Sequence, residues 1–313
     1  MYPITTVTLN PCIDKSTKIP LLVPEKKMRC SAPIFEPGGG GINVARVLNR
    51  FGCKALAIYP AGGYSGKFLS QLLSMEDIPS NCIETASHTR ENLIVFEESS
   101  GKQYRFGMPG AALQKVELLH CLKAIEESQS EFIVVSGSLA TMQAQDAIAI
   151  IANRAKQQNK KLVIDTSGPS IKVALEVGVF MIKPNLGELS VLLDKEATIA
   201  SAGTLAKEIV EKGQAQNVIV SLGKAGALLI TKELHIHFTP PAVKTISTVG
   251  AGDSMVAGIL YKLVNGWTMA DACKYGVACG TAATMNPGTE LCHKSDAELL
   301  FAKVKVNNNV AHY

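Results

Sequence analysis

Short apolar segments and amphipathic segments alternate along most of the chain. Runs such as FIVVSG (132–137) and KLVIDTSG (161–168) are typical of buried strands, and the segments between them repeat apolar residues at helical spacing. Apolar strands separated by helices predict a mainly parallel sheet covered on both faces, which is an α/β fold. We expect strands at 4–9, 54–63, 132–137, 161–168, 179–185, 217–223, 226–231 and 235–238, and helices at 42–51, 67–75, 114–129, 143–158, 169–176, 187–193, 203–213 and 271–286.

Two segments interrupt this alternation. Residues 13–35 mix short strand-like pieces with prolines and charges, and residues 88–106 follow the order strand, Ser-Ser-Gly turn, strand. We therefore predict a small β sheet formed by about 13–35 and 88–107, within one domain that spans 1–313. As a functional element this sheet is a lid. As a structural element it is a flap that joins two copies of the chain, and one sheet can serve both purposes.

A glycine-rich turn, STVGAGDSMVAG (247–258), connects a strand-like run to a helical one. Such a turn directs free backbone N–H groups at the start of a helix toward an anion. Asp253 lies in this turn, and two interpretations are open. It is either the N-cap of the helix, or a base that takes a proton from a nucleophile while the amides stabilise charge on a transferring phosphoryl group.

A second glycine cluster, at 38–41, also precedes a helix. Its missing Cβ atoms allow a ligand to approach the backbone closely. No register of this cluster supplies the G-x-G-x-x-G pattern of dinucleotide-binding folds. The segment GGYSGKF (62–68) is not a P-loop, because its spacing is one residue short and Phe68 replaces the required Ser or Thr. The two commonest nucleotide-binding folds are therefore excluded.

Composition narrows the class of protein further. The 313 residues are 47% hydrophobic and 19% charged, with a net charge of +4 and no long block of like charges, so a small-anion site is favoured over nucleic-acid binding. Eight singly spaced cysteines are typical of reduced thiols. The N-terminal residues lack the pattern of a signal peptide, and no apolar run is long enough for a membrane span. We expect a cytoplasmic protein without a nucleic-acid or membrane partner.

The two glycine motifs, GGGGINVAR and TVGAGDSMVAG, together resemble the paired signatures of the ribokinase-like (PfkB) family of sugar kinases. Further matches occur at TLNPCID, HTREN, GKQYRFGMPG, VSGSL, IKPNLGEL and VSLGKAGAL, so the resemblance covers essentially the whole chain. It implies a three-layer αβα sandwich of the ribokinase type with a β lid, and ATP-dependent phosphorylation of a sugar. The phosphosugar kinases are the most similar branch of the family.

The resemblance also implies roles for individual residues. Asp253 becomes the general base and the amides of Gly250, Ala251 and Gly252 the anion hole, an arrangement suited to phosphoryl transfer. Asp14, Gly39, Asn43 and Ser138 are implied to contact the sugar. Arginines grip phosphate bidentately, and Arg90 and Arg105 match the phosphate-contacting segments of the family. Lys27 and Arg29 are implied to assist them, although solvated surface residues are the alternative.

Nucleotide and metal sites are implied in the same way. Asn185 and Glu188 match the N-x-x-E element that holds Mg²⁺ through water, while Glu188 in a helix first turn is the structural alternative. The residues implied to bind ATP are Lys183, Asn185, Ser221, Gly223, Gly226 and Asn286. Carbonyls implied to hold K⁺ belong to Ser247, Val249, Ala283, Asn286, Gly288 and Glu290.

Position 40 indicates the substrate. The 1-phosphofructokinase and tagatose-6-phosphate kinase branches usually have lysine there, whereas the minor-isozyme 6-phosphofructokinases have glycine, as in this chain. We therefore expect phosphorylation of fructose 6-phosphate at its 1-hydroxyl, with the other two branches as alternatives. Outside enzymes, the alternative is a sugar-phosphate-binding regulator that has lost catalysis. The sequence departs from the family at Ala140, Thr141 and Met142, where two prolines and a glycine are usual, and we expect this loop to change KM before it changes the reaction.

Overall fold

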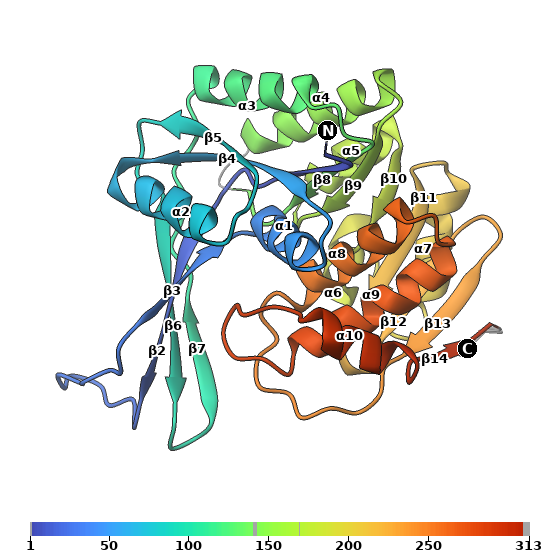
Figure 1. Cartoon of the computed structure of the whole chain (residues 1–313). Helices are drawn as coiled ribbons and strands as arrows, with labels where there is room; N and C mark the ends of the chain where they lie inside the picture. Colours follow the sequence, from blue (N-terminus) through green and yellow to red (C-terminus); the bar gives the residue numbers. More distant parts are fainter. Residues whose placement is uncertain (1, 140–142, 169, 309–313) are drawn as a thin grey trace.

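The computed structural model describes residues 2–139, 143–168 and 170–308, and it contains two separate sheets (Figure 1). The larger has ten strands in the order β14-β13-β12-β11-β10-β9-β8-β1-β4-β5. Neighbouring strands from β11 to β5 are parallel, and the last three strand pairs at the other edge are antiparallel. The prediction of a mainly parallel α/β sheet is confirmed.

Apart from two edge strands, the strands of this sheet are short and largely buried, as the apolar runs indicated. Their bounds are β1 Ile4–Val7, β4 Ala55–Gly62, β5 Ser80–Thr85, β8 Phe132–Ser136, β9 Lys161–Asp165, β10 Val179–Ile182, β11 Ala215–Ser221, β12 Ala227–Ile230, β13 His235–Thr239 and β14 Lys305–Asn307. Strand β1 lies inside the sheet, hydrogen-bonded to β4 and β8, so the first strand of the chain holds together strands formed much later.

Helices cover both faces of the sheet and bury a separate apolar core on each (Figure 1). One core lies under α1 Gly40–Arg50, α2 Gly63–Met75, α8 Ala251–Val264, α9 Met269–Ala283 and α10 Lys294–Phe301. The other lies under α3 Lys115–Glu127, α4 Gln143–Gln157, α5 Ser170–Val177, α6 Leu186–Leu193 and α7 Ala202–Glu211. In the described part of the chain, no helix has both the length and the apolar character needed to cross a bilayer.

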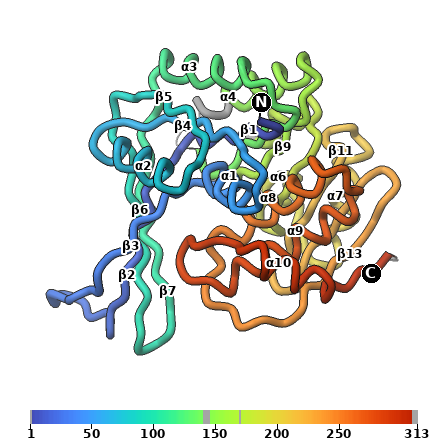
Figure 2. The backbone as a smooth tube through the Cα atoms, in the orientation of Figure 1, coloured from blue at the N-terminus to red at the C-terminus, as the bar shows by residue number. Residues whose placement is uncertain are grey.

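The second sheet is the predicted lid. It has the strand order β3-β2-β6-β7, with β2 Cys12–Ile19, β3 Ile34–Gly38, β6 Arg90–Glu97 and β7 Lys102–Phe106. Strands β6 and β7 form the expected hairpin, whereas β2 and β6 pair in parallel and bring two distant segments side by side (Figure 2). The register places Asp14, Asn92 and Arg105 on one face of this sheet, because Asp14 pairs with Asn92 and side chains alternate along each strand.

Three elements were not predicted. Strand β5 is an edge strand with exposed residues, and β14 is a short exposed strand at the opposite edge. Helix α10 is only eight residues long, and it buries Ala297 and Leu300 against the core. All three lie at the rim of the fold, where partial exposure leaves little hydrophobic periodicity to detect. The three positions at which the sequence departs from the family, Ala140, Thr141 and Met142, lie outside the described part of the chain.

Candidate active site

The site forms at one end of the main sheet, where parallel strands finish and two glycine-led helices begin. The ends of β1, β8, β9 and β10 carry Asn10, Ser136, Asp165 and Lys183 respectively. Side chains from the starts of α1 and α8 contact this edge. In an open α/β sheet, the crevice beyond the carboxyl ends of the strands is the expected ligand site.

Asp253 lies in the first turn of α8, but it does not cap the helix. The N-cap is Gly250, whose φ of 70° is readily adopted by glycine. The Asp253 carboxylate instead accepts hydrogen bonds from Asn43 Nδ2 at 2.9 Å and from Ser136 Oγ at 3.4 Å. The N-cap interpretation of this residue was therefore wrong, and its side chain is held across the crevice by two other elements.

The surroundings of Asp253 change its acidity. Burial raises the pKa of its carboxyl to about 6, and the nearby negative charge of Asp165 acts in the same direction. The hydrogen bond from Asn43, the Lys183 ammonium and the hydrogen bond from Ser136 oppose this rise. A carboxylate whose pKa is close to neutral can accept a proton efficiently at physiological pH and pass it on afterwards.

Lys183 places a positive charge beside the predicted anion hole. Its ammonium is 3.0 Å from Asp165 Oδ1, and its side chain is only 7% exposed. A Cβ added to Gly252 would lie 3.1 Å from Lys183 Nζ, so this glycine allows the lysine to approach the first turn of α8. Burial alone would lower the pKa of Lys183, but the charge and hydrogen bond of Asp165, together with the charges of Asp253 and Glu188, raise this pKa overall, so the lysine stays charged.

The glycine cluster before α1 packs directly on the crevice. Gly39 is the N-cap of α1 with a φ of 115°, and a Cβ on Gly40 would lie 2.2 Å from Ser136 Oγ. A side chain on Gly40 would push β8 and α1 apart, and one on Gly39 would collide with Thr8. Asn43, in the first turn of α1, donates to Asp253, while its buried Oδ1 has no hydrogen-bond partner among the described residues. This oxygen is free to accept a hydrogen bond from a ligand hydroxyl.

Asp14 faces the same crevice from the lid. Its carboxylate is buried, and Oδ1 accepts hydrogen bonds from Asn92 Nδ2 at 2.9 Å and from Cys12 Sγ at 3.3 Å. A Cβ on Gly38 would lie 2.5 Å from Asp14 Oδ2, so strand β3 also needs glycine here. Cys12 is a buried thiol whose pKa is raised by burial and by Asp14, and it therefore stays protonated and donates.

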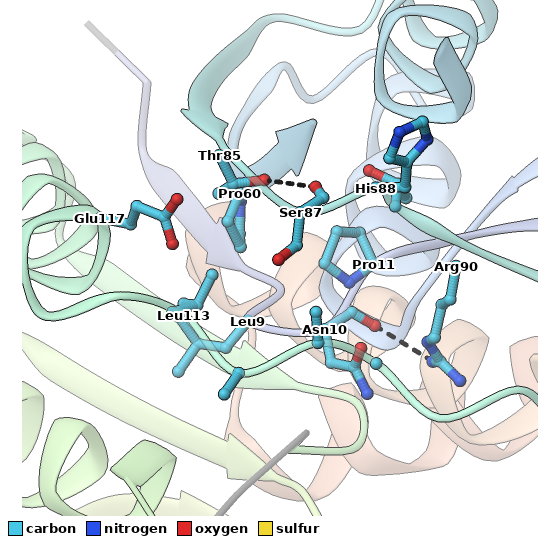
Figure 3. Close-up of a pocket in the computed structure, with 14 residues that line it drawn as sticks. Leu9, Asn10, Pro11, Pro60, Thr85, Ser87, His88, Arg90, Leu113 and Glu117 are labelled. Carbon is cyan, nitrogen blue, oxygen red and sulfur yellow. Dashed lines mark hydrogen bonds between the residues drawn. The ribbon is translucent and has the colours of Figure 1, made fainter. Parts of the chain in front are cut away.

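Arg90 is anchored at the start of β6 beside a small pocket (Figure 3). Its guanidinium donates to the backbone oxygens of Asn10 at 3.1 Å and Met108 at 3.0 Å, and to Ser138 Oγ at 3.4 Å. Its Nε is a buried donor that has no partner within the described ranges of the chain. The structure thus brings the predicted residues Arg90 and Ser138 together and leaves a donor for an anion.

The other predicted lid cations differ in their placement. Arg105 of β7 donates to Thr248 Oγ1 at 3.1 Å, so the lid contacts the turn that leads into α8. Lys27 and Arg29 lie exposed in the connection between β2 and β3, and neither forms an ion pair or hydrogen bond with a residue that the structure describes. The structure does not bring these two side chains into the cluster.

A pocket of about 640 Å³ adjoins the start of α8, and a volume of this size suits a nucleotide. Four predicted residues line it, together with Ala251 and Gly252 of the anion hole: Asn185, Ser221, Gly223 and Gly226. Its apolar wall includes Val243, Met255 and Val277. Asn286 is not among the lining residues, because its side chain donates to the backbone oxygen of Leu291 at 2.7 Å.

Asn185 and Glu188 form a capping box at the start of α6. Asn185 Oδ1 accepts from the Glu188 amide, and Glu188 Oε2 accepts from the Asn185 amide, both at 2.9 Å. The structural alternative for Glu188 is thus present in the fold. Asn185 lines the pocket, and the partly exposed Glu188 carboxylate is hydrogen-bonded to it; these hard oxygens fit Mg²⁺ bound through water.

The segments predicted to hold K⁺ also lie together. Ser247 Oγ donates to the Gly288 carbonyl at 3.2 Å, and the Ser247 amide donates to Thr284. A Cβ on Gly250 would lie 2.2 Å from Leu291 Cδ2, so the second segment packs against the predicted anion hole. Backbone carbonyls from two facing loops fit a monovalent cation. Within the described residues, no group of three or more His, Cys, Asp or Glu side chains could form a metal site.

Three residues of the cluster were not predicted from the sequence. Ser136 contacts Asp253, Asp165 pairs with Lys183, and Asn92 links Asp14 to Arg90. Ser136 and Asp165 are the last residues of their strands, β8 and β9, so a polar residue at a strand's carboxyl end was the available signal. Asn92 lies within HTREN, but only the register of β2 and β6 places it opposite Asp14.

Comparison with known proteins agrees with this geometry. Residues 6–296 match the model of the pfkB family carbohydrate kinases. The ATP-dependent 6-phosphofructokinase isozyme 2 of Escherichia coli (strain K12) is 43% identical over 305 residues, covering 96% of this chain and 99% of that protein. A crystal structure of phosphofructokinase-2 from Escherichia coli in complex with potassium has a TM-score of 0.93 at 43% identity, with 97% and 99% of the two chains covered.

A second structure of that enzyme, in complex with fructose-6-phosphate, has a TM-score of 0.91 at 41% identity and covers 97% of this chain and 99% of the other. The likeness extends over both the main sheet and the lid, because nearly the full length of each chain is aligned. The protein belongs to the PfkB family of carbohydrate kinases.

Proposed function

We propose that this protein transfers the γ-phosphoryl group of ATP to the 1-hydroxyl of fructose 6-phosphate, giving fructose 1,6-bisphosphate. The observation that carries the proposal is the Asp253 carboxylate. It lies between Asn43 and Ser136, with a pKa of about 6, at a helix start beside the buried Lys183. The similarity to 6-phosphofructokinase isozyme 2 of Escherichia coli supports the choice of substrate.

In this proposal Asp253 accepts the proton of the 1-hydroxyl as its oxygen attacks the γ-phosphorus. The bond from that phosphorus to the β-phosphate oxygen breaks, and ADP leaves. The Gly250, Ala251 and Gly252 amides and the Lys183 ammonium stabilise the charge on the transferring group. Mg²⁺ held near Asn185 and Glu188 would neutralise phosphate charge when bound.

The sugar site needs groups for both ends of the substrate. Asp14 and Asn43 Oδ1, which has no partner within the described ranges, are suited to sugar hydroxyls, and Gly39 leaves room for the ring. Arg90, whose Nε has no partner among the residues that the structure describes, and Ser138 are suited to the 6-phosphate. Arg105 reaches the same crevice from the lid. The nucleotide lies in the pocket beside Gly223 and Gly226, and carbonyls near Ser247 and Gly288 hold K⁺.

A substrate panel tests the proposal. Purified protein is assayed with ATP and fructose 6-phosphate, fructose 1-phosphate or tagatose 6-phosphate, and we expect the highest kcat/KM for fructose 6-phosphate. Preference for fructose 1-phosphate would favour the 1-phosphofructokinase alternative and would overturn our interpretation of Gly40. Binding of sugar phosphate without any ATP-dependent turnover would instead favour the regulator.

The role of Asp253 is tested by Asp253→Asn. We expect kcat to fall by about 10²- to 10⁴-fold while fructose 6-phosphate still binds, because the amide cannot accept the proton. Asp271→Asn is a matched control, since Asp271 occupies the equivalent first-turn position of α9 and is exposed. Full activity of Asp253→Asn would rule out the general-base assignment.

We also propose that two copies of the chain associate through the lid. The lid is a single layer of four strands, and several of its large apolar side chains are exposed: Leu21, Ile34, Tyr104, Phe106 and Met108. A second copy can cover such a surface. Association would also give Lys27 and Arg29, which are solvated in one copy, a neighbouring surface to contact.

A further inference from the structure

Asn92 is the residue through which the two ends of the sugar site are connected. Its amide nitrogen donates to Asp14 Oδ1 at 2.9 Å and contacts Cys12 Sγ at 3.1 Å. Its amide oxygen accepts from Arg90 Nη1 at 3.4 Å and from the Met108 amide at 3.1 Å. The orientation of the amide group follows from these neighbours, because acceptors surround its nitrogen and donors surround its oxygen.

The consequence for Asp14 is an asymmetric carboxylate. Asn92 and Cys12 both hydrogen-bond to Oδ1, so the protein uses this oxygen, while no protein donor contacts Oδ2 among the described residues. The carboxylate is buried, and Gly38 packs against it without a side chain. The group can therefore present only Oδ2 to a sugar hydroxyl, in an orientation that Asn92 sets.

The consequence for Arg90 is a defined position of its guanidinium. Backbone oxygens of Asn10 and Met108 hold two of its nitrogens, and Asn92 holds both the same Nη1 and the Met108 amide beside it. Through Met108, Asn92 also fixes the chain that leaves β7. The Asp14 carboxylate and the Arg90 guanidinium thus hydrogen-bond to the same carboxamide. The distance between them therefore depends on the geometry of β6.

We propose that Asn92 is a positioning residue that holds the Asp14 carboxylate and the Arg90 guanidinium at a fixed separation, so that the site selects a ketose with hydroxyl and phosphate groups at matching distance. This inference rests on the proposed function. Asn92 makes no contact with the reacting atoms and acts only through its two neighbours. Its loss therefore weakens substrate binding more than it slows the chemical step.

Two variants test this positioning role. Asn92→Asp keeps the acceptor side toward Arg90 and Met108, but it places a second carboxylate against Asp14. Asn92→Ala removes both sides. For each we expect KM for fructose 6-phosphate to rise by about 10- to 100-fold, because hydrogen bonds from a neutral carboxamide to charged groups are lost, with kcat and KM for ATP within about threefold of wild type. Glu91→Gln is the control, since this exposed neighbour points to the other face of β6.

A double-mutant cycle with Arg90→Ala distinguishes positioning from general damage to the fold. Once the guanidinium is absent, we expect Asn92→Ala to raise KM by a smaller factor than it does in the wild-type background, because only Asp14 is left for Asn92 to position. Fully multiplicative effects, or equal losses in kcat and both KM values with a lower Tm, would overturn the inference. If the wild-type protein fails to turn over fructose 6-phosphate with ATP, the proposed function itself fails; if it turns over normally and the Asn92 variants keep its KM, only the inference fails.

Discussion

The acidity of Asp253 leads to a prediction for the pH dependence of catalysis. A general base works in its deprotonated form, and the pKa of this carboxyl lies at about 6. Activity should therefore be complete above this value and fall as pH decreases through 6, by about tenfold per pH unit in kcat/KM. The substrate phosphate titrates in the same range, with a second pKa of about 6, so a profile of the wild-type protein alone does not identify the group.

Two variants resolve this ambiguity, because they leave the substrate unchanged. Ser136→Ala removes a hydrogen bond that lowers the pKa of Asp253, so its acidic limb should move to higher pH. Asp165→Asn removes a negative charge that raises the pKa of Asp253, and it also releases the Lys183 ammonium from its ion pair. The acidic limb of this variant should therefore move to lower pH. Coincident profiles for both variants and wild type would assign the titration to the substrate.

At this scale the sequence was most informative where a motif carries the chemistry. Asp253, Asn43, Asp14 and Arg90 belong to contiguous patterns and could be named before the structure was known. The sequence could not reveal that Asp253 faces Asn43 rather than capping its own helix, because that contact joins residues from opposite ends of the chain. Partners such as Asp165 and Asn92 become visible only through strand order and register.

At the scale of elements, a buried arginine joins α1 to its surroundings. Arg46 is 2% exposed, forms a bidentate contact with Glu76 beyond the end of α2, and donates to the backbone oxygens of Pro37 and Thr289. The glycine cluster of the proposed sugar site is therefore anchored by the same arginine as the loop proposed to bind K⁺.

Arg46→Met should lower the free energy of unfolding by about 3 kcal/mol, because two buried carbonyls and a carboxylate lose their donor. Arg154→Met is the control: its pair with Glu126 is 33% and 46% exposed, and we expect a loss below about 1 kcal/mol. Chemical denaturation of both variants measures the difference. Equal losses of unfolding free energy in the two variants would show that burial does not increase the contribution of Arg46 to stability.

Elements whose apolar residues are buried on both sides could be predicted with nearly correct bounds, as β8 and β9 illustrate. The edge strands β5 and β14 could not, because most of their residues are exposed and carry no apolar alternation. The lid was recognised as β structure, but its pairing was not. Nothing in residues 12–19 indicates that they pair in parallel with residues 90–97.

At the scale of the whole molecule, the exposed apolar side chains of the lid predict a dimer. Sedimentation at micromolar protein concentration should give the mass of a dimer. Phe106→Lys and Ile34→Lys should shift the protein toward monomer and raise KM for fructose 6-phosphate, because these side chains are 45% and 63% exposed within one chain. Leu299→Lys, at a 67% exposed position on α10, is the matched control. A wild-type monomer would contradict the prediction.

The parallel pairing of β2 with β6 has a consequence for the order in which the molecule assembles and opens. Helix α1, strand β4, helix α2 and strand β5 lie between the two lid strands in the chain, so the pair forms only after a long loop has closed. The lid also buries fewer apolar side chains than either core of the main sheet. It is therefore the part of the fold expected to detach at the lowest free energy. Asp14 and Arg90 would leave with it, while Asp253 and the nucleotide pocket stay assembled on the main sheet.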